Sequence, residues 1–372
     1  MTATRATYLD WNANAPMRPE AVTAVAEALS HCGNPSSIHR AGRHARQRVN
    51  QARERVAALV GVSPEEVVFT GGGTEANVLA LQGFPNHRVI VSAVEHESVL
   101  AVVPDAVRVP VLANGVVDLD ALARLLTTDA GPALVSLMFA NNETGALQPI
   151  ADVARLVHAR GGLLHCDAVQ GPGKVPLDFR ALDVDAMTIS GHKIGGPMGT
   201  GALIVRGDLS LQSLIKGGGQ ERGRRAGTEN LPGIVGFGAA ALLAKDEIGA
   251  AENVERLRVE AERRLLDVAP DAVVFAADVA RLPNTISIAM PRVAASTQVI
   301  ALDLAGVMVS AGAACSSGKV TRSHVLDAMG VAPAMAECAI RISLGWGTTD
   351  ADIDHLVEAW GALYARTRAS AA

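Results

Sequence analysis

The chain has 372 residues, which is long for one ordinary hydrophobic core and predicts two domains, or one large α/β domain with an appendage. Hydrophobic residues make up 49% and charged residues 19%, which is the balance of a well-packed globular protein. A formal net charge of -5 and 3% aromatic residues argue against a nucleic-acid-binding protein, which normally carries a basic face with stacking rings.

The expected location is cytoplasmic, without membrane contact. The N-terminus has no secretory signal pattern, and no apolar run is long enough to cross a bilayer. The four cysteines are widely spaced and form no C-x-x-C pair, so we expect free thiols and no intrinsic metal site. These cysteines are Cys32, Cys166, Cys315 and Cys338.

In chain order, short β-rich runs alternate with amphipathic helical patterns, which is typical of βαβ units and predicts a mainly parallel sheet with helices on both faces. A helical face over residues 45–59 can end at Gly61. The expected strands are Val67–Phe69, Arg88–Ser92, Val107–Pro110, Ala133–Phe139, Gly162–Cys166, Ala186–Ser190 and Gly201–Val205.

The composition shifts after Gly238, and the remaining sequence predicts a smaller α+β domain. Helical sequence is expected from about Ala239 to Ala269, followed by further elements and a final helix from Ala351. Those further elements are a strand at Thr285–Ala289, a helix near Gln298–Leu304, a glycine-rich loop at Ser310–Gly318 and a strand at Ala339–Leu344. We expect a large domain at 15–250 and a small one made of 1–14 and 251–372.

A glycine-rich turn between an expected strand and an expected helix suits an anion. In Thr70–Asn77, the backbone N–H groups of the first helical turn and the Thr74 hydroxyl are aimed at one point. The alternative is a structural glycine turn with a threonine N-cap, which is commoner for such a motif seen alone.

Two strand ends carry residues that suit pyridoxal phosphate, a cofactor that acts as an electron sink in amino-acid chemistry. Lys193 follows a strand and is framed by Ser190 and His192, which can donate to a phosphate, so it is a candidate Schiff-base lysine. Asp167 ends another strand and can keep a pyridinium nitrogen protonated, although a helix N-cap explains this residue alone equally well. Ligands gather at such strand ends in open α/β sheets.

Three further polar segments are open to two interpretations each. His96 is a candidate for ring stacking and proton transfer, although a surface histidine between two glutamates is the commoner case. Asn141–Gly145 suits an ordinary turn, or a clamp on a cofactor or substrate oxygen. Gly217–Asn230 is a basic solvated loop, or a loop whose Thr228 and arginines reach an anion in this or a neighbouring subunit.

Cys315 and Arg341 are the remaining candidates. Cys315 lies among small residues that cannot pack tightly, so it is expected to be exposed and mobile, and nearby positive charge would favour its nucleophilic thiolate. Most isolated cysteines are instead inert and buried. Arg341 lies in a β-pattern, where it needs either a bound carboxylate or an internal salt bridge.

Together these segments resemble the cysteine desulfurase family, the class V aminotransferase relatives that supply sulfur for iron–sulfur clusters. The resemblance runs in order over nearly the whole chain, and its glycine- and arginine-rich string is particularly similar to the nitrogen-fixation type. The matching segments are Tyr8–Asp10, Gly33–Ser37, Thr70–Asn77, Glu95-His96, Asn141–Gly145, His165–Gln170, Ser190–Lys193, Gly217–Asn230, Cys315 and Arg341.

The resemblance implies a fold-type I pyridoxal-phosphate enzyme, in which a mainly parallel seven-stranded sheet is sandwiched by helices and a smaller α+β domain carries a mobile catalytic loop at 310–322. The implied catalytic residues are Cys315, Lys193 and His96. The implied cofactor-binding residues are Gly73, Thr74, Asn142, Asp167, Gln170, Ser190, Gly191, His192, Lys193 and Thr228. The implied substrate-binding residues are Arg341, Asn142 and, less strongly, Asn34.

The roles implied for these residues define one reaction, the removal of sulfur from L-cysteine to give L-alanine and a persulfide on Cys315. Lys193 holds pyridoxal 5′-phosphate and moves the Cα proton, with Asp167 on the ring nitrogen and Gln170 on the ring hydroxyl. Thr228 acts across a homodimer interface. The loop then passes sulfur to an iron–sulfur scaffold or another acceptor protein, and Cys315 is also a potential transient iron–sulfur ligand.

The chain departs from the usual family pattern at a few positions near the expected site. Members commonly have threonines where this chain has Asn14-Ala15-Pro16, and often Val and Thr at Cys166 and Val169. The segment after Cys315 is long, which favours the mobile-loop group over the short-loop group that depends on a dedicated partner.

Three alternatives remain open from the sequence. The first is another pyridoxal-phosphate reaction on the same fold, such as that of a selenocysteine lyase or an aminotransferase. The second is a non-catalytic scaffold of cluster assembly, against which the joint retention of Lys193, Asp167 and Cys315 argues. The third is nucleic-acid binding through Arg40–Arg55 and Glu221–Arg225, which the acidic balance disfavours.

Overall fold

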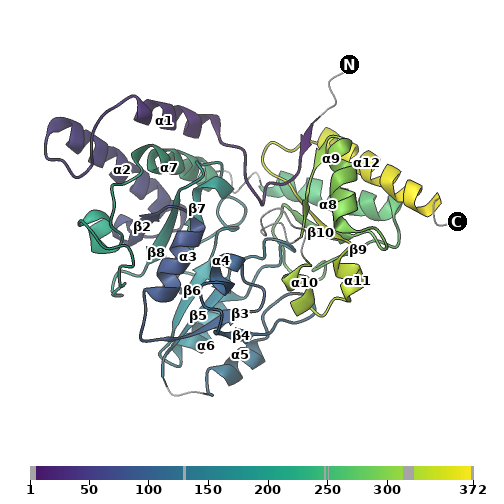
Figure 1. Ribbon diagram of the computed structural model, residues 1–372, viewed down its shortest axis with the longest axis horizontal. Helices are drawn as coiled ribbons and strands as arrows, with labels where there is room; N and C mark the ends of the chain where they lie inside the picture. Colours follow the sequence, from purple (N-terminus) through teal and green to yellow (C-terminus); the bar gives the residue numbers. More distant parts are fainter. Residues whose placement is uncertain (1–5, 129–130, 247–248, 250, 313–321, 370–372) are drawn as a thin grey trace.

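The computed structural model describes residues 6–128, 131–246, 249, 251–312 and 322–369, and within these it has two lobes (Figure 1). The larger lobe is built around a sheet from the first two thirds of the chain. The smaller lobe contains the C-terminal elements together with the N-terminal strand β1, so both ends of the described chain lie in the smaller lobe.

The sheet of the larger lobe is mainly parallel, as predicted. Among the described residues it has seven strands, and only β8 runs antiparallel to its neighbours, β2 and β7. In spatial order the strands are β2 (Val67–Thr70), β8 (Gly201–Val205), β7 (Ala186–Ser190), β6 (Leu163–Asp167), β5 (Ala133–Met138), β3 (Arg88–Ser92) and β4 (Val107–Val109). Every expected strand of this lobe is confirmed to within one residue at either end.

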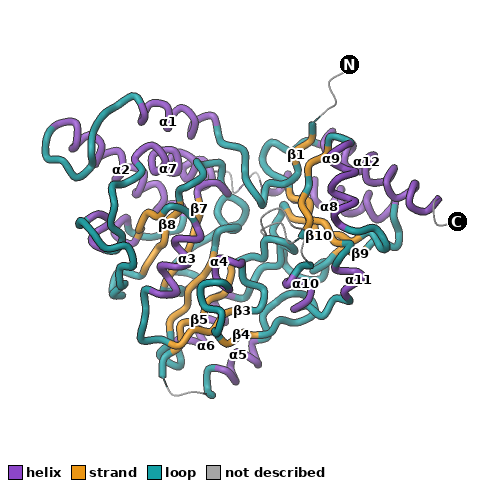
Figure 2. The backbone as a smooth tube through the Cα atoms, viewed as in Figure 1, coloured by secondary structure: helices purple, strands orange, loops and turns teal. Residues whose placement is uncertain are grey.

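Helices cover both faces of this sheet because alternate residues of its strands pack in different cores (Figure 2). In β2, Val67 and Phe69 pack with α1, α2, α6 and α7, whereas Val68 packs with α3 and α4. The helices are α1 (Pro19–Leu29), α2 (Arg40–Leu59), α3 (Gly73–Gln82), α4 (Glu97–Leu100), α5 (Leu119–Leu125), α6 (Ile150–His158) and α7 (Leu231–Asp246), with 3₁₀ turns η1 (Pro64–Glu66), η2 (Gly191–Lys193) and η3 (Gln220–Gly223).

Helix α7 begins at Leu231, whereas the sequence predicts helix only after Gly238. The glycines in its first half are typical of a loop, but in the structure they permit close packing against α1 and α2. A Cβ at Gly236 would lie 2.6 Å from Val25 Cγ2, and one at Gly238 would lie 2.6 Å from Ala52 Cα. Tertiary packing therefore outweighs the poor helix propensity of glycine here.

The smaller lobe contains an antiparallel sheet in the order β12-β13-β10-β9 and a parallel pair, β1-β11. Its predicted strands and final helix are confirmed. The strands are β1 (Thr7–Tyr8), β9 (Val273–Val274), β10 (Thr285–Ala289), β11 (Val307–Met308), β12 (Ser310–Ala311) and β13 (Ala339–Ser343); the helices are α8 (Ala251–Val268), α9 (Ala295–Leu304), α10 (His324–Ala328), α11 (Pro333–Ala336) and α12 (Asp350–Ala369).

Leu9 packs in the core of the smaller lobe, with residues of α8, α9 and α12, although it lies near the N-terminus. The core on one face of the large sheet draws on α1, α2, α5, α6 and α7 and on Leu282. These separate cores support the division that we propose, with one domain at 15–250 and the other made of 1–14 and 251–372. Among the described helices, none is both long and apolar enough to cross a bilayer.

Candidate active site

A cavity of about 340 Å³ lies at the carboxyl edge of the large sheet, where ligands bind in open α/β folds. Residues that follow β2, β3, β5, β6 and β7 line it, and β13 of the smaller lobe contributes Arg341. Its lining residues are Asn12, Ala13, Gly73, Thr74, Asn77, His96, Ser98, Met138, Ala140, Asn142, Asp167, Val169, Gln170, Ser190, His192, Lys193 and Arg341.

Most residues predicted for the site line this cavity. The exceptions are Gly191, Thr228, Asn34 and Cys315, and Cys315 lies outside the described residues. Gly191 is packed beneath the wall, because a Cβ there would lie 2.6 Å from Thr200 Oγ1. Thr228 is exposed on the loop after η3.

Asn34, predicted as a weaker substrate-binding residue, lies away from the cavity within this chain. It is exposed ahead of α2, and its Oδ1 accepts a hydrogen bond of 2.9 Å from the backbone N–H of Ser36. This is the local turn role that asparagine commonly plays, and the sequence pattern did not distinguish it from a ligand-binding role.

The predicted anion cup has the geometry that a phosphate needs. Helix α3 begins at Gly73 and has Gly72 as its N-cap, at φ 150°, so no side chain caps its first backbone N–H groups. The absence of a side chain at Gly73 lets the helix begin close to Ser190, whose Cβ would be 3.5 Å from an added Cβ. Ser190 Oγ is buried and has no hydrogen-bond partner within the described part of the chain.

Asp167 is held by a hydrogen-bonded chain that the sequence did not predict. Its Oδ2 accepts from Asn77 Nδ2 at 2.8 Å, and its Oδ1 accepts from the backbone N–H of Val169 at 3.1 Å. Asn77 also donates to Ser98 Oγ at 2.9 Å, and His96 Nδ1 lies 2.8 Å from the same oxygen. The two residues proposed to face the cofactor ring are therefore linked through Ser98 and Asn77.

A buried acid lies beneath this chain. Glu95 is fully buried, and its Oε1 accepts a 2.6 Å hydrogen bond from the backbone N–H of Met138. Burial, with the nearby charge of Asp167, raises the pKa of Glu95 well above the usual range. Its buried position therefore favours the protonated, neutral form of Glu95.

Lys193 follows β7 directly, in η2, and its amine reaches back to the N-terminal segment. Lys193 Nζ donates to Asn12 O at 2.5 Å and to Ala13 O at 2.8 Å. Its neighbour His192 has Nδ1 3.2 Å from Asn14 Oδ1, so the departure from threonine at Asn14 supplies a direct partner to a predicted phosphate-binding residue.

The pKa of His192 is lowered by burial and by two neighbouring amines. Burial first, and then the charges of Lys193 and Lys174, lower the pKa of His192 from 6.5 to about 4. The imidazole is therefore neutral at neutral pH, with one N–H to donate and no positive charge of its own.

Asn12 is the most connected site residue that the sequence analysis missed. It is 1% exposed, and its backbone N–H donates to Ser343 Oγ at 3.0 Å. Its Nδ2 donates to Thr285 Oγ1 at 2.9 Å and to Asn142 O at 3.2 Å. Asn12 thus ties the larger lobe's cavity to β10 and β13 of the smaller lobe, and no local motif signals this.

Arg341 makes the internal salt bridge that was one of its two interpretations. Its Nη2 lies 2.7 Å from Asp10 Oδ1, and its Nη1 donates to Asn142 O at 3.2 Å. Asp10 in turn accepts from Ser310 Oγ at 2.7 Å. These contacts hold the guanidinium at the lining of the cavity.

The loop that carries Thr228 is fixed to the anion cup by ion pairs. Glu221 forms a buried bidentate pair with Arg53, at 2.6 and 2.7 Å, and Arg225 pairs with Glu75 of α3 at 2.7 and 3.1 Å. At least part of this basic loop is therefore neutralised internally rather than solvated. Thr228 follows these anchors by a few residues, at the surface of the larger lobe.

Two described residues near the ends of the segment with Cys315, Gly312 and Ser323, meet at one buried acid. Ser323 Oγ donates to Glu143 Oε2, and a Cβ added at Gly312 would lie 2.9 Å from the same oxygen. Burial raises the pKa of Glu143, while Ser323, His324, Arg341 and His96 act against this rise. Both ends of the segment are therefore close to the groups that surround the cavity.

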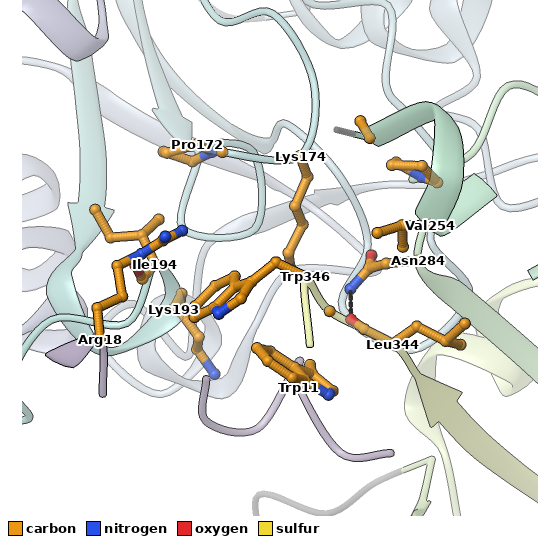
Figure 3. Close-up of a pocket in the computed structure, with 14 residues that line it drawn as sticks. Trp11, Arg18, Pro172, Lys174, Lys193, Ile194, Val254, Asn284, Leu344 and Trp346 are labelled. Carbon is orange, nitrogen blue, oxygen red and sulfur yellow. Dashed lines mark hydrogen bonds between the residues drawn. The ribbon is translucent and has the colours of Figure 1, made fainter. Parts of the chain in front are cut away.

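Lys193 also borders a smaller pocket of about 40 Å³, which has room for a few water molecules (Figure 3). Trp11 and Trp346 form part of its wall, with ring centroids 4.6 Å apart, and the Arg18 guanidinium lies 3.8 Å from the Trp346 ring centroid. Lys174 lines this pocket from the turn that follows β6.

His165 should make the protein less stable in mild acid. It is fully buried between Ser136 Oγ at 2.9 Å and Thr188 Oγ1 at 3.0 Å, and burial lowers its pKa to about 4, against the opposing charge of Asp167. Because the unfolded histidine titrates near 6.5, the unfolded state binds more protons between pH 6.5 and 4, and stability falls as pH decreases through this window. We expect a loss of about 2 kcal/mol between pH 7 and 5.

Urea unfolding at both pH values measures this loss. His165→Gln keeps hydrogen-bonding capacity without titrating, so it should remove about 2 kcal/mol of the difference between pH 7 and 5, while the contribution of His192, whose pKa is also about 4, should remain. An unchanged difference in His165→Gln would assign the acid sensitivity to other groups, of which His192 is the first candidate.

The fold and cavity agree with the comparisons to known proteins. The family model for Aminotransferase class-V matches residues 7–356, so the chain belongs to the class V aminotransferase family. Within it the chain belongs with the cysteine desulfurases. A cysteine desulfurase of Cereibacter sphaeroides is 44% identical over 94% of each chain.

Solved structures agree with this assignment. The X-ray structure of a NifS-like protein from Rickettsia africae superposes with a TM-score of 0.90, at 36% identity over 97% of this chain and 99% of that one. A structure of SspA in complex with cysteine has a TM-score of 0.78, at 29% identity over 91% of this chain and 98% of that one. The predicted fold-type I architecture is therefore confirmed.

Proposed function

We propose that this protein uses pyridoxal 5′-phosphate to remove sulfur from L-cysteine, giving L-alanine and a persulfide on Cys315. The observation that carries this proposal is the meeting of an amine, a carboxylate and an anion cup at one cavity, as Lys193, Asp167 and the start of α3. This set matches the aldehyde, the ring nitrogen and the phosphate of that cofactor.

The residues present fit the phosphate end of the cofactor. Ser190 Oγ is buried without a described partner, and the first turn of α3 has no side-chain cap, so both supply donors for a phosphate oxygen. Thr74 adds a hydroxyl on the same side of the cavity, and we propose that the neutral His192 lies against the phosphate there. We propose that Thr228 completes this set across a homodimer interface.

When bound, the cofactor supplies an electron sink that stores the electron pair released from the substrate's Cα–H bond. The chain's own residues would hold and orient it. Asp167 would pair with the ring nitrogen, and Asn77 fixes the orientation of its carboxyl group. His96 offers a flat face to the ring, and Gln170 offers an amide to the ring hydroxyl.

The substrate would be held and deprotonated by residues on the same wall. Arg341 and Asn142 are proposed to bind its carboxylate, with the Asp10 pair keeping the guanidinium in place. Once its amine is free, Lys193 takes the Cα proton and returns a proton later, from a position between the main cavity and the small pocket.

Cys315 is proposed to receive the sulfur. Its thiolate attacks the substrate sulfur; the S–S bond forms as the Cβ–S bond breaks, and the electron pair of the broken bond stays on the substrate carbon. Protonation of that carbon completes alanine, and the persulfide remains on Cys315. An iron–sulfur scaffold or another thiol acceptor would then take the sulfur, in a cytoplasm that keeps thiols reduced.

Product analysis tests this proposal. Purified protein loaded with pyridoxal phosphate should convert L-cysteine to alanine and sulfide in equal amounts when a dithiol reductant is present to release the persulfide sulfur. Formation of a keto acid in place of alanine would identify an aminotransferase instead. A protein that stays colourless with added cofactor would contradict the proposal altogether.

A further inference from the structure

A second lysine, Lys174, lies beside the site, and its contacts suggest a role that none of the motifs indicates. It follows Gln170 in the turn after β6 and lines the small pocket rather than the main cavity (Figure 3). Its Nζ lies 2.5 Å from Gln170 Oε1 and 2.9 Å from Asn12 Oδ1. Both partners border the main cavity, so Lys174 acts from behind its wall.

The contact with Lys174 distinguishes the two ends of the Gln170 amide. A backbone oxygen can only accept, so the end of the Gln170 amide beside Asn12 O is the nitrogen, and the end that faces Lys174 is the carbonyl oxygen. Its Nε2 therefore faces the other way, where it donates to Asn12 O at 3.0 Å. An amide nitrogen carries two hydrogens, and the second is available to an acceptor in the cavity.

The same lysine fixes Asn12. Asn12 Oδ1 accepts from both Lys174 Nζ and Asn284 Nδ2, at 2.9 and 3.0 Å. The backbone oxygen of Asn12 accepts hydrogen bonds from both Gln170 Nε2 and Lys193 Nζ. Lys174, Gln170, Asn12 and Lys193 thus form one connected network, in which each amide has a single orientation.

Burial, with Lys193 and Arg341 nearby, lowers the pKa of Lys174 well below that of an ordinary lysine. Both forms of the amine have enough N–H groups for the two acceptors, two when it is neutral and three when it is protonated.

We infer that Lys174 is a positioning residue that keeps the donor end of Gln170, rather than its carbonyl end, turned toward the hydroxyl of the cofactor ring. This inference rests on the proposed function. Without Lys174 only the bond from Nε2 to Asn12 O still holds the Gln170 amide, and a rotated amide would turn its carbonyl oxygen toward the ring oxygen. The expected cost is about tenfold in cofactor affinity, the value of one hydrogen bond to a charged acceptor.

The test compares two cofactors on three proteins. Lys174→Met removes the donor and keeps much of the length and bulk, whereas Lys174→Arg keeps donors at this position. Each cofactor-free protein is titrated with pyridoxal phosphate and with 3-deoxypyridoxal phosphate, which lacks the ring hydroxyl. Binding is followed by absorbance and by the fluorescence of Trp11 and Trp346.

We expect Lys174→Met to bind pyridoxal phosphate about tenfold more weakly than the parent does, while its affinity for the deoxy analogue stays unchanged. Its bound cofactor should also show a shifted absorption maximum, and Lys174→Arg should recover most of both effects. Equal weakening of both ligands would indicate a structural role, and unchanged affinities would indicate no role; either result overturns the inference. A parent that binds neither ligand would instead refute the proposed function, and the inference with it.

Discussion

Replacing Lys193 by alanine should lower the rate of alanine formation from L-cysteine at least about a thousandfold, because the change removes the amine that we propose holds the cofactor and moves the Cα proton. The amine contacts two backbone oxygens of the N-terminal segment, Asn12 O and Ala13 O, so the fold should tolerate its loss. Circular dichroism and the melting temperature should therefore stay close to those of the parent.

The matched control for Lys193→Ala is Lys216→Ala, which removes an exposed lysine directly before the loop at Gly217–Asn230. Lys216→Ala should keep the parent's rate and its cofactor absorbance. If Lys193→Ala desulfurated cysteine at a rate within tenfold of the parent's, the assignment of the Schiff-base lysine would be wrong, and Lys174 would be the next amine to replace.

Cys315→Ala should abolish the release of sulfide from cysteine, again by at least about a thousandfold, because the nucleophile that accepts the sulfur is gone. Unlike Lys193→Ala, it should bind pyridoxal phosphate with unchanged affinity, and its absorbance should still respond to added cysteine. Incubating the parent with labelled cysteine and digesting it without reductant should recover the label on the peptide that contains Cys315.

Cys32→Ala is the matched control for the thiol, since Cys32 is an exposed free cysteine of the larger lobe. It should label and turn over like the parent. Full activity in Cys315→Ala would favour a lyase that releases sulfur or selenium directly, without a protein persulfide, and this is the first alternative that the sequence left open.

The sequence predicted the large sheet well because its signal is local. Each strand is a short apolar run bounded by turns, and such a run can be recognised without knowledge of its partners. The anion cup was predictable for the same reason, since the strand, the glycine turn and the helix are adjacent in sequence. The positions of Asp167 and Lys193 at the same sheet edge followed from strand order alone.

What the sequence did not predict depends on contacts between distant segments. Asn12 meets Ser343, and Arg341 meets Asp10, across separations of 331 residues, so no periodicity or spacing can indicate either pair. Lys174 lies only four residues after Gln170, but a lysine after a glycine looks like a solvated turn residue in sequence. The turn around Asn34 could not be foreseen to place it away from the cavity of its own chain, because an asparagine in a turn has the same pattern whether or not it faces a ligand.

The pairing of β1 with β11 has a consequence for how the protein is made. Thr7 pairs with Val307, and Asn12 receives its partner Ser343 from near the end of the chain. As the ribosome releases the chain from its N-terminus, the large sheet can form while Asn12 still lacks its long-range partners, and such non-local contacts form slowly. The segment that receives the Lys193 amine is therefore completed last, so the newly made protein should take up its cofactor only after translation has ended.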